Sequence, residues 1–223
     1  MRKCCKMRNK AIRKNIHIIA SKILLVTLLL VTAVSMDARK FDIYELSLDE
    51  NLETPEVKSK FSEKIQVYQY DQAVELIKQN YEVELMRNNE IVIITIPADK
   101  LFGANDTTLT EGGKAQIKNI LRFLKNPGFY KMLLVMHSDN SGSKKYLVQL
   151  TRARVNAVYD WIDGNAKVDF VVPYALGDNE PLNNNNSMVN RRENRRLEIY
   201  LVPGEVMINQ AKRGTININL LKK

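Results

Sequence analysis

The sequence predicts an α/β sandwich with helices packed on one sheet, and three patterns predict it. Residues 132–136 form an uninterrupted apolar run, which is typical of a strand buried on both faces. Apolar residues recur at helical spacing from Lys144 to Ile162. Residues 197–201 alternate apolar and polar side chains, as a strand with one buried face does. Because strands and helices alternate along the chain, the α/β class follows.

The first 38 residues have the pattern of a signal peptide. They hold eight basic residues and one acidic residue of a 223-residue chain whose net charge is +9. Basic residues from Arg2 to Lys22 precede an apolar run from Ile23 to Val34, as in export signals. The alternative is an uncleaved anchor, because residues 16–34 approach the length of a membrane span, although Lys22 interrupts them.

Two details of this segment affect its processing. Translation starts at either Met1 or Met7, and the sequence leaves both alternatives open. Cys4 and Cys5 precede the apolar run, so neither is placed for lipidation after it, and no cysteine follows them. The exported part therefore forms no disulfide and no thiol-dependent site.

The charge of the remaining residues argues against a nucleic-acid partner. Without residues 1–38 the net charge falls to +2, too little for a face that neutralises many phosphates. The exception is the cluster Arg191, Arg192, Arg195 and Arg196, which lacks interleaved aromatic residues. We interpret it as a solvated or structurally paired turn. Membrane contact is expected only through the N-terminal segment, if that segment stays uncleaved.

Residues 39–88 are predicted to be a linker with a short helix and a hairpin strand. The stretch up to about Lys64 is rich in charge and shows no sustained period. A short helix is expected at Asp71–Asn80, and a strand around residues 83–85. Asn88 and Asn89 tolerate the positive φ of a tight turn, after which residues 91–96 return as a second strand.

The next elements alternate between helix and strand. Thr110 is expected to cap an amphipathic helix that ends near residues 126–128, and Ser143 and Gly164 bound the next helix. Trp161, near the end of that helix, is assigned to the core. A strand at Val168–Val172 follows.

A short helix capped by Ser187 precedes the final strand at residues 197–201. Residues 204–223 are predicted to be a C-terminal tail, in which Thr215–Leu220 alternates like an edge strand.

One loop and one helix position suggest a site for a zwitterion. The loop His137-Ser138-Asp139-Asn140-Ser141-Gly142 follows the buried strand, and Arg154 lies in the apolar stripe of the next helix. A guanidinium on the core-facing side of a helix needs an anion against it. That anion is either a ligand carboxylate or Asp139 itself, and Asp139 is also of the type that braces its own loop.

These residues, taken in order, resemble the OmpA-like peptidoglycan-binding domain. The loop H-S-D-N-S-G, the helix segment L-T-R-A-R, then G-D-N-E-P and N-R-R-E-N-R-R-L-E-I carry the resemblance. It extends from about Ile91 to Val202 and includes Leu101–Asn105, so we predict an OmpA-like domain at residues 89–203. The resemblance implies a βαβαβ arrangement with helices on one mixed sheet.

The resemblance also implies a ligand, the diaminopimelate of the peptidoglycan stem peptide. Asp139 would accept the ammonium protons, Arg154 would fork onto the carboxylate, and Asn105 would add an amide contact. Arg195 and Arg196 would brace the fold. The expected protein is an exported, non-enzymatic anchor in the periplasm of a Gram-negative cell, associated with the outer membrane, with peptidoglycan and other envelope proteins as partners.

Two positions depart from the family. Leu147 stands where the family usually has asparagine, and Met136 stands where it usually has glycine, which is expected to crowd the backbone near the pocket. These departures leave open an OmpA-fold protein-interaction module that has lost the ligand.

Metal and cofactor chemistry is not predicted. His137 is the only histidine after the export signal and has no cysteine near it, so a zinc site is not expected. His137 and Ser138 are neighbours in an extended segment, where side chains point to opposite faces, so they do not indicate a hydrolase.

Overall fold

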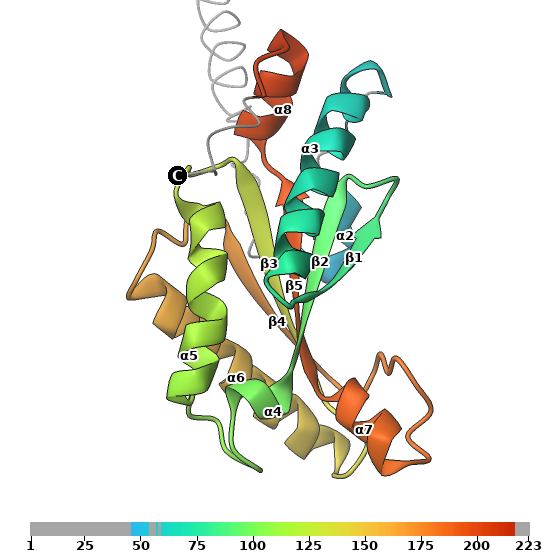
Figure 1. The fold of residues 1–223 in the computed structure, drawn as a ribbon. Helices are drawn as coiled ribbons and strands as arrows, with labels where there is room; N and C mark the ends of the chain where they lie inside the picture. The colour runs from blue at the N-terminus through green and yellow to red at the C-terminus, as the bar shows by residue number, and fades with distance from the viewer. Residues whose placement is uncertain (1–45, 54–56, 58, 217–223) are drawn as a thin grey trace, which may run out of the picture. The chain divides into compact units, whose positions relative to one another are not determined.

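The computed structural model describes residues 46–53, 57 and 59–216, and its centre is a five-stranded sheet (Figure 1). The strand order is β1-β2-β5-β3-β4, and only the pairing of β3 with β4 is parallel, so the sheet is mixed. The strands are β1 (Glu82–Met86), β2 (Ile91–Pro97), β3 (Tyr130–His137), β4 (Val171–Gly177) and β5 (Arg196–Pro203). The predicted fold class is confirmed.

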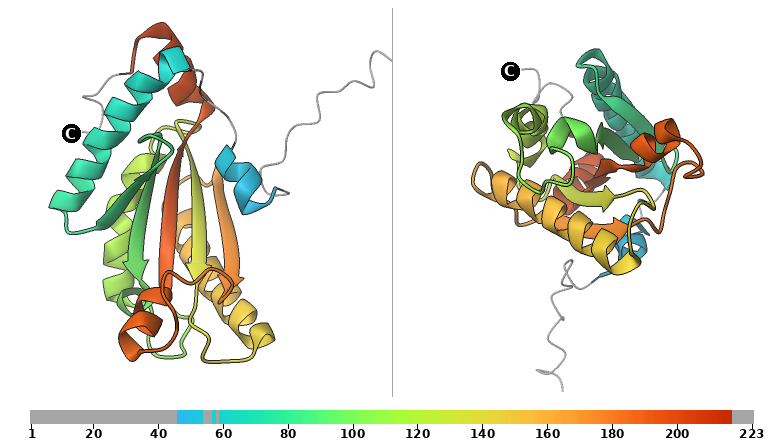
Figure 2. Two further views of the ribbon diagram at one scale, coloured as in Figure 1. Left: turned by 90° about the vertical axis from the view of Figure 1, so that its right-hand side faces the viewer. Right: turned by 90° about the horizontal axis from the view of Figure 1, so that it is seen from below.

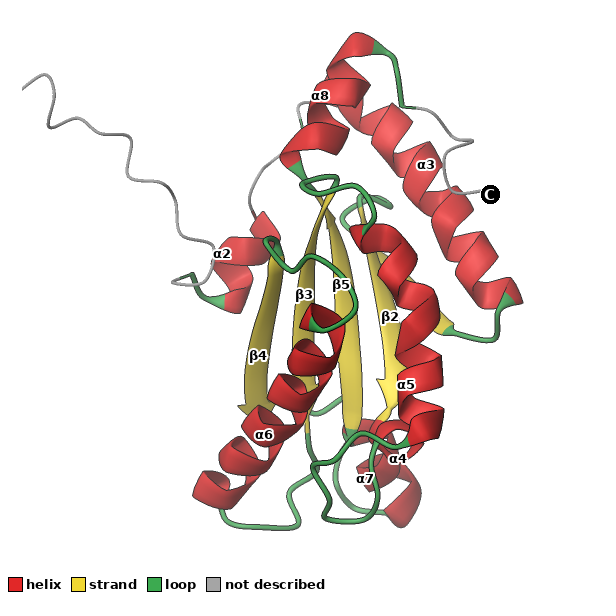
Figure 3. Ribbon diagram, turned by 90° about the vertical axis from the view of Figure 1, so that its left-hand side faces the viewer, coloured by secondary structure: helices red, strands yellow, loops and turns green. Residues whose placement is uncertain are grey.

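The helices cover mainly one face of the sheet, as Figure 3 shows for α5 and α6. They are α2 (Leu48–Glu53), α3 (Ser59–Lys78), α4 (Ala98–Leu101), α5 (Glu111–Lys118), the 3-10 helix η1 (Asn119–Leu124), α6 (Lys144–Asp163), α7 (Met188–Asn194) and α8 (Glu205–Arg213). Helices α3 and α8 contact each other near one end of the sheet, and α4 and α7 lie at the other end (Figures 1 and 2).

The main core lies between the sheet and these helices. Met132, Leu134 and Met136 of β3 point into it, together with Val155 and Val158 of α6. Every residue of β3 is buried, as the apolar run predicts for a strand with another strand on each side. The opposite face carries a smaller cluster that includes Leu133 and Val135, and Leu48 and Leu52 of α2 pack against it.

The predicted helix caps are confirmed. The side-chain oxygens of Thr110, Ser143 and Ser187 accept hydrogen bonds from backbone N–H groups in the first turns of α5, α6 and α7. Gly164 is the C-cap of α6. The helix expected after Thr110 is α5 followed by η1, which ends just before residues 126–128.

The β1–β2 hairpin also forms as predicted. The two strands pair antiparallel, from Glu82 with Thr95 to Met86 with Ile91. Asn88 and Asn89 have φ values of 52° and 66°, in the left-handed region that asparagine tolerates. The hairpin strand is therefore an edge of the main sheet.

Helix α3 corrects the prediction of a linker up to about Lys64 and a short helix at Asp71–Asn80. It spans 20 residues and begins at Ser59. Its buried face mixes Ile65 and Leu76 with polar residues, above all Gln69, whose amide donates to the carbonyls of Glu90 and Leu201 at 2.8 and 3.0 Å. Because a buried position of this helix is occupied by a polar glutamine, the apolar residues do not recur at regular helical spacing, and the sequence pattern does not reveal the full helix.

Two further elements differ from prediction. Strand β4 covers residues 171–177 rather than 168–172, and it contains Pro173, which an edge strand tolerates because one side of its ladder is unpaired. Residues 205–213 of the expected tail form α8, with Met207 and Ala211 buried. Most of the alternating segment Thr215–Leu220 lies outside the described residues, as does the whole predicted signal peptide.

The second face of the sheet holds a buried ionic cluster around Glu198. Arg196 Nε and the Tyr200 hydroxyl donate to its carboxylate at 2.6 and 2.5 Å, and His137 Nε2 lies 3.3 Å away. Burial raises the pKa of Glu198, but these three groups outweigh burial and lower the pKa to about 2. Arg196 therefore braces the fold, as predicted.

This cluster predicts an acid-sensitive fold. A carboxyl with a folded pKa of about 2 and an ordinary value of 4.5 stabilises the fold above pH 4.5. That stabilisation is lost as the pH falls from 4.5 towards 2. We expect Glu198→Gln to flatten the fall in the free energy of unfolding across this window, measured by chemical denaturation at stepped pH.

The control for this prediction is Glu111→Gln, which changes a glutamate whose side chain is 89% exposed. We expect the Glu111 variant to keep the acid dependence of the unchanged chain. An equal acid dependence in the Glu198 variant would remove the role assigned to the cluster.

Candidate functional site

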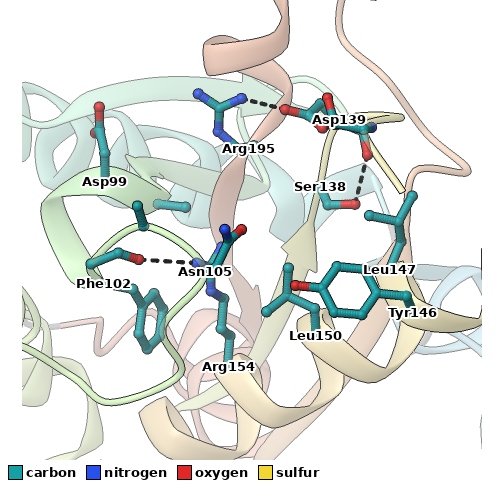
Figure 4. A pocket seen from close by; sticks show the side chains of 14 residues that line it. Asp99, Phe102, Asn105, Ser138, Asp139, Tyr146, Leu147, Leu150, Arg154 and Arg195 are labelled. Atoms are coloured by element: carbon teal, nitrogen blue, oxygen red, sulfur yellow. Dashed lines mark hydrogen bonds and ion pairs between the residues drawn. The ribbon is translucent and has the colours of Figure 1, made fainter. Parts of the chain in front are cut away.

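A pocket of about 330 Å³ lies where β3 ends (Figure 4). One wall is formed by α4 and the loop after it, and another by the β3–α6 loop and α6. Arg195, between α7 and β5, completes the lining. It is lined by Ala98, Asp99, Phe102, Gly103, Ala104, Asn105, Ser138, Asp139, Ser141, Tyr146, Leu147, Leu150, Arg154 and Arg195. The three predicted site residues, Asp139, Arg154 and Asn105, are thus brought together.

Asp139 is held rigidly in the loop after β3 and is only 4% exposed. Its Oδ1 accepts the N–H of Ser141 at 2.8 Å, and its Oδ2 forms an ion pair with Arg195 Nη1. Burial raises the pKa of Asp139, but the Ser141 and Arg195 hydrogen bonds outweigh burial, so the pKa is lowered overall. Asp139 therefore presents a carboxylate to the pocket at neutral pH.

Arg154 is 5% exposed and comes from the core-facing side of α6. Its Nε donates to the carbonyl of Asp106 at 2.8 Å and its Nη2 to that of Gly103 at 3.3 Å. Its guanidinium carbon lies 5.1 Å from the centre of the Phe102 ring. Arg154 thus fixes the loop after α4, and its hydrogen bonds go to neutral carbonyls rather than to a carboxylate.

Asp139 and Arg154 share one pocket but have separate protein partners. Asp139 pairs with Arg195, and Arg154 binds backbone oxygens. The alternative of an internal Asp139–Arg154 pair is therefore not the arrangement that the structure has. Burial lowers the pKa of Arg154 and the charge of Arg195 lowers it further, and together they outweigh Tyr146 and Asp106, which raise it.

Asn105 lies in the loop between α4 and α5. Its φ of 55° is left-handed, a conformation that asparagine adopts more readily than most residues. It is exposed and lines the pocket. Asn105 thus forms a turn, and it belongs to the same pocket as Asp139 and Arg154.

Arg195 has a place in the pocket that the sequence did not predict. The resemblance made both Arg195 and Arg196 bracing residues, and Arg196 is buried in the ionic cluster around Glu198. Arg195 braces the Asp139 loop through its ion pair, and it also lines the pocket. The two arginines are neighbours in an extended segment, where successive side chains point to opposite faces.

The two departures from the family have different consequences. Leu147 is 2% exposed and forms part of the pocket wall, where it offers no hydrogen bond. Met136 is fully buried in the main core and does not line the pocket. The Met136 side chain points into the core between sheet and helices, and the pairing of β3 with β4 shifts register between Met136 and His137.

Within the part of the chain that the structure describes, no group of three or more histidine, cysteine, aspartate or glutamate side chains is arranged to hold a metal ion. Among the same residues, no helix has the length and apolar character needed to cross a membrane.

Comparisons with known proteins show the fold. No family model matches the chain, and neither does any curated protein. Among solved structures, a MotB-like protein from Desulfovibrio vulgaris matches with a TM-score of 0.56 and 15% identity, over 63% of this chain and 94% of that one. The chain therefore shares the α/β fold of this MotB-like protein, with helices packed on one mixed sheet as the sequence predicts.

Two further solved structures match with lower TM-scores. The cell wall anchor of the T6SS from Pseudomonas aeruginosa has a TM-score of 0.47 and 25% identity, over 62% of this chain and 96% of that one. The OmpA-like domain of FopA1 from Francisella tularensis has a TM-score of 0.43 and 18% identity, over 56% of this chain and 82% of that one.

Proposed function

We propose that this chain is an exported binding module that attaches non-covalently to peptidoglycan. The ligand is the diaminopimelate of the stem peptide, whose free end carries an ammonium and a carboxylate on one carbon. Asp139 accepts the ammonium, Arg154 takes the carboxylate, and Asn105 adds an amide contact. No bond is made or broken, and the chain acts in the periplasm as an anchor between envelope and cell wall.

One observation carries the proposal. Arg154 is a nearly buried cation whose hydrogen bonds go to backbone carbonyls, and it lines an open pocket that also holds the carboxylate of Asp139. A cation in such a place is favoured by an anion that neutralises it. A ligand with both charges therefore pairs with Asp139 and Arg154 at once.

Replacing Asp139 by asparagine tests this proposal. The amide keeps an oxygen for the Ser141 N–H but loses the charge that attracts an ammonium, so we expect affinity for purified sacculi to fall by about tenfold or more. Co-sedimentation of the purified chain with sacculi measures the loss. The control is Asp160→Asn, which makes the same charge change at an exposed position of α6. Equal pelleting of both variants would remove the proposal.

A second function is supported by Leu147. An apolar side chain in the pocket wall favours an OmpA-fold module that binds another envelope protein and has lost the wall ligand. Calorimetry with soluble diaminopimelate at millimolar concentration separates the two functions. Heat of binding supports the first, and its absence, together with capture of a defined envelope protein, supports the second.

A further inference from the structure

Only part of the hydrogen-bonding capacity of Arg195 is used within the protein. Its Nη1 pairs with Asp139 Oδ2, and its side chain is 38% exposed. Within the described ranges, Nε and Nη2 of Arg195 donate to no protein acceptor. A guanidinium carries five N–H donors in a planar fork, so Arg195 keeps donors for another group.

The charged groups at the pocket are unevenly paired. Arg154 and Arg195 both line it, and the charge of Arg195 lowers the pKa of Arg154, whereas the carboxylate of Asp106, outside the lining, raises it. Asp139 offsets one of them. Asp99 also lines the pocket, but its carboxylate accepts from Arg192 Nε at 2.6 Å, and Arg192 is not part of the lining.

A ligand end with one ammonium and one carboxylate engages Asp139 and Arg154, and it leaves the remaining donors of Arg195 without an anion. A second carboxylate on the ligand would accept from those donors. Asp139 does not have to release Arg195 for this, because a carboxylate has lone pairs enough to accept from a guanidinium and an ammonium together. Figure 4 shows Arg195 on the same side of the pocket as Asp139.

We propose that Arg195 determines specificity by binding a second carboxylate of the ligand, while Asp139 holds the ammonium and Arg154 the first carboxylate. This proposal rests on the function proposed above. It names the preferred ligand class as a diamino dicarboxylic acid whose second carboxyl group is free. Stem peptides in which that group is amidated, or joined to a further residue, then bind more weakly.

Two ligands test the role of Arg195 separately from the proposed binding of peptidoglycan. The first is diaminopimelate acetylated on one amine, with both carboxylates free. The second differs only in carrying a carboxamide in place of the carboxylate at the acetylated end. Both keep the intact amino-acid end that Asp139 and Arg154 bind, so calorimetry with the full chain measures the second carboxylate alone.

We expect the unchanged chain to prefer the free acid by about tenfold, as one partly exposed charge-assisted contact would give. In Arg195→Gln that preference falls below about twofold, and in Arg195→Lys it is partly restored because the charge returns without the fork. The matched control is Arg192→Gln, which removes one positive charge beside the pocket and keeps the preference.

Several outcomes would overturn the inference. If Arg195→Gln weakens or strengthens both probes by the same factor, Arg195 only positions Asp139 or competes for it. If Arg192→Gln abolishes the preference equally, the effect is long-range charge. If neither probe binds the unchanged chain, the proposed function itself fails, and this outcome is distinct from the others.

Discussion

Replacing Arg154 by methionine is expected to lower the affinity for diaminopimelate by about 30-fold or more, the largest effect on binding of any single change at this site. The variant loses the charge-assisted fork onto the ligand carboxylate, and contacts of this kind contribute roughly 2 kcal/mol. It also loses the hydrogen bonds to Asp106 and Gly103, which hold the loop that carries Asn105. Calorimetry with soluble diaminopimelate measures the change.

Two controls make the Arg154 result specific. Arg152→Met removes the same charge from an exposed position on the same helix, and we expect it to leave affinity unchanged. Arg154→Lys keeps the charge and loses the fork, so its affinity should lie between those of the unchanged chain and the methionine variant. If Arg152→Met and Arg154→Met bind alike, Arg154 does not contact the ligand.

Replacing Gly204 by alanine is expected to destabilise the fold by roughly 2–3 kcal/mol, the largest effect on stability. A Cβ at Gly204 would lie 2.2 Å from the carbonyl oxygen of Gly128 and 2.8 Å from its carbon. Both contacts are with backbone, so no side-chain rotation relieves them. The chain turns here from β5 into α8, and the N–H of Gly204 donates to Phe129 at 2.9 Å.

The melting temperature measures this effect. For a chain of this size, we expect Tm to fall by roughly 5–10 °C in Gly204→Ala. The matched control is Gly112→Ala in α5, where the nearest atom to a new Cβ is Thr110 Oγ1 at 3.8 Å. Alanine there should stabilise by about 0.5–1 kcal/mol, because glycine is a poor helix former. An unchanged Tm for Gly204→Ala would show that the backbone between β5 and α8 shifts to accommodate the new Cβ without loss of stability.

The elements that could be predicted are those with a local physical cause. An apolar run without alternation predicted β3, and capping hydroxyl side chains predicted where α5, α6 and α7 begin. These signals depend only on neighbouring residues. Helix α3 and strand β4 were misjudged because their stability comes from distant partners, such as the carbonyl of Leu201 that binds Gln69.

The sequence by itself determined the fold class, the presence of an acid just after β3, and an arginine on the core-facing side of α6, because each follows from hydrophobic period and local spacing. Only the tertiary structure decided how their charges are shared. Arg195 meets Asp139 across 56 positions of sequence, and Arg154 meets Asp106 across 48. Such pairings depend on how strands and loops are brought together at one end of the sheet, which no local pattern encodes.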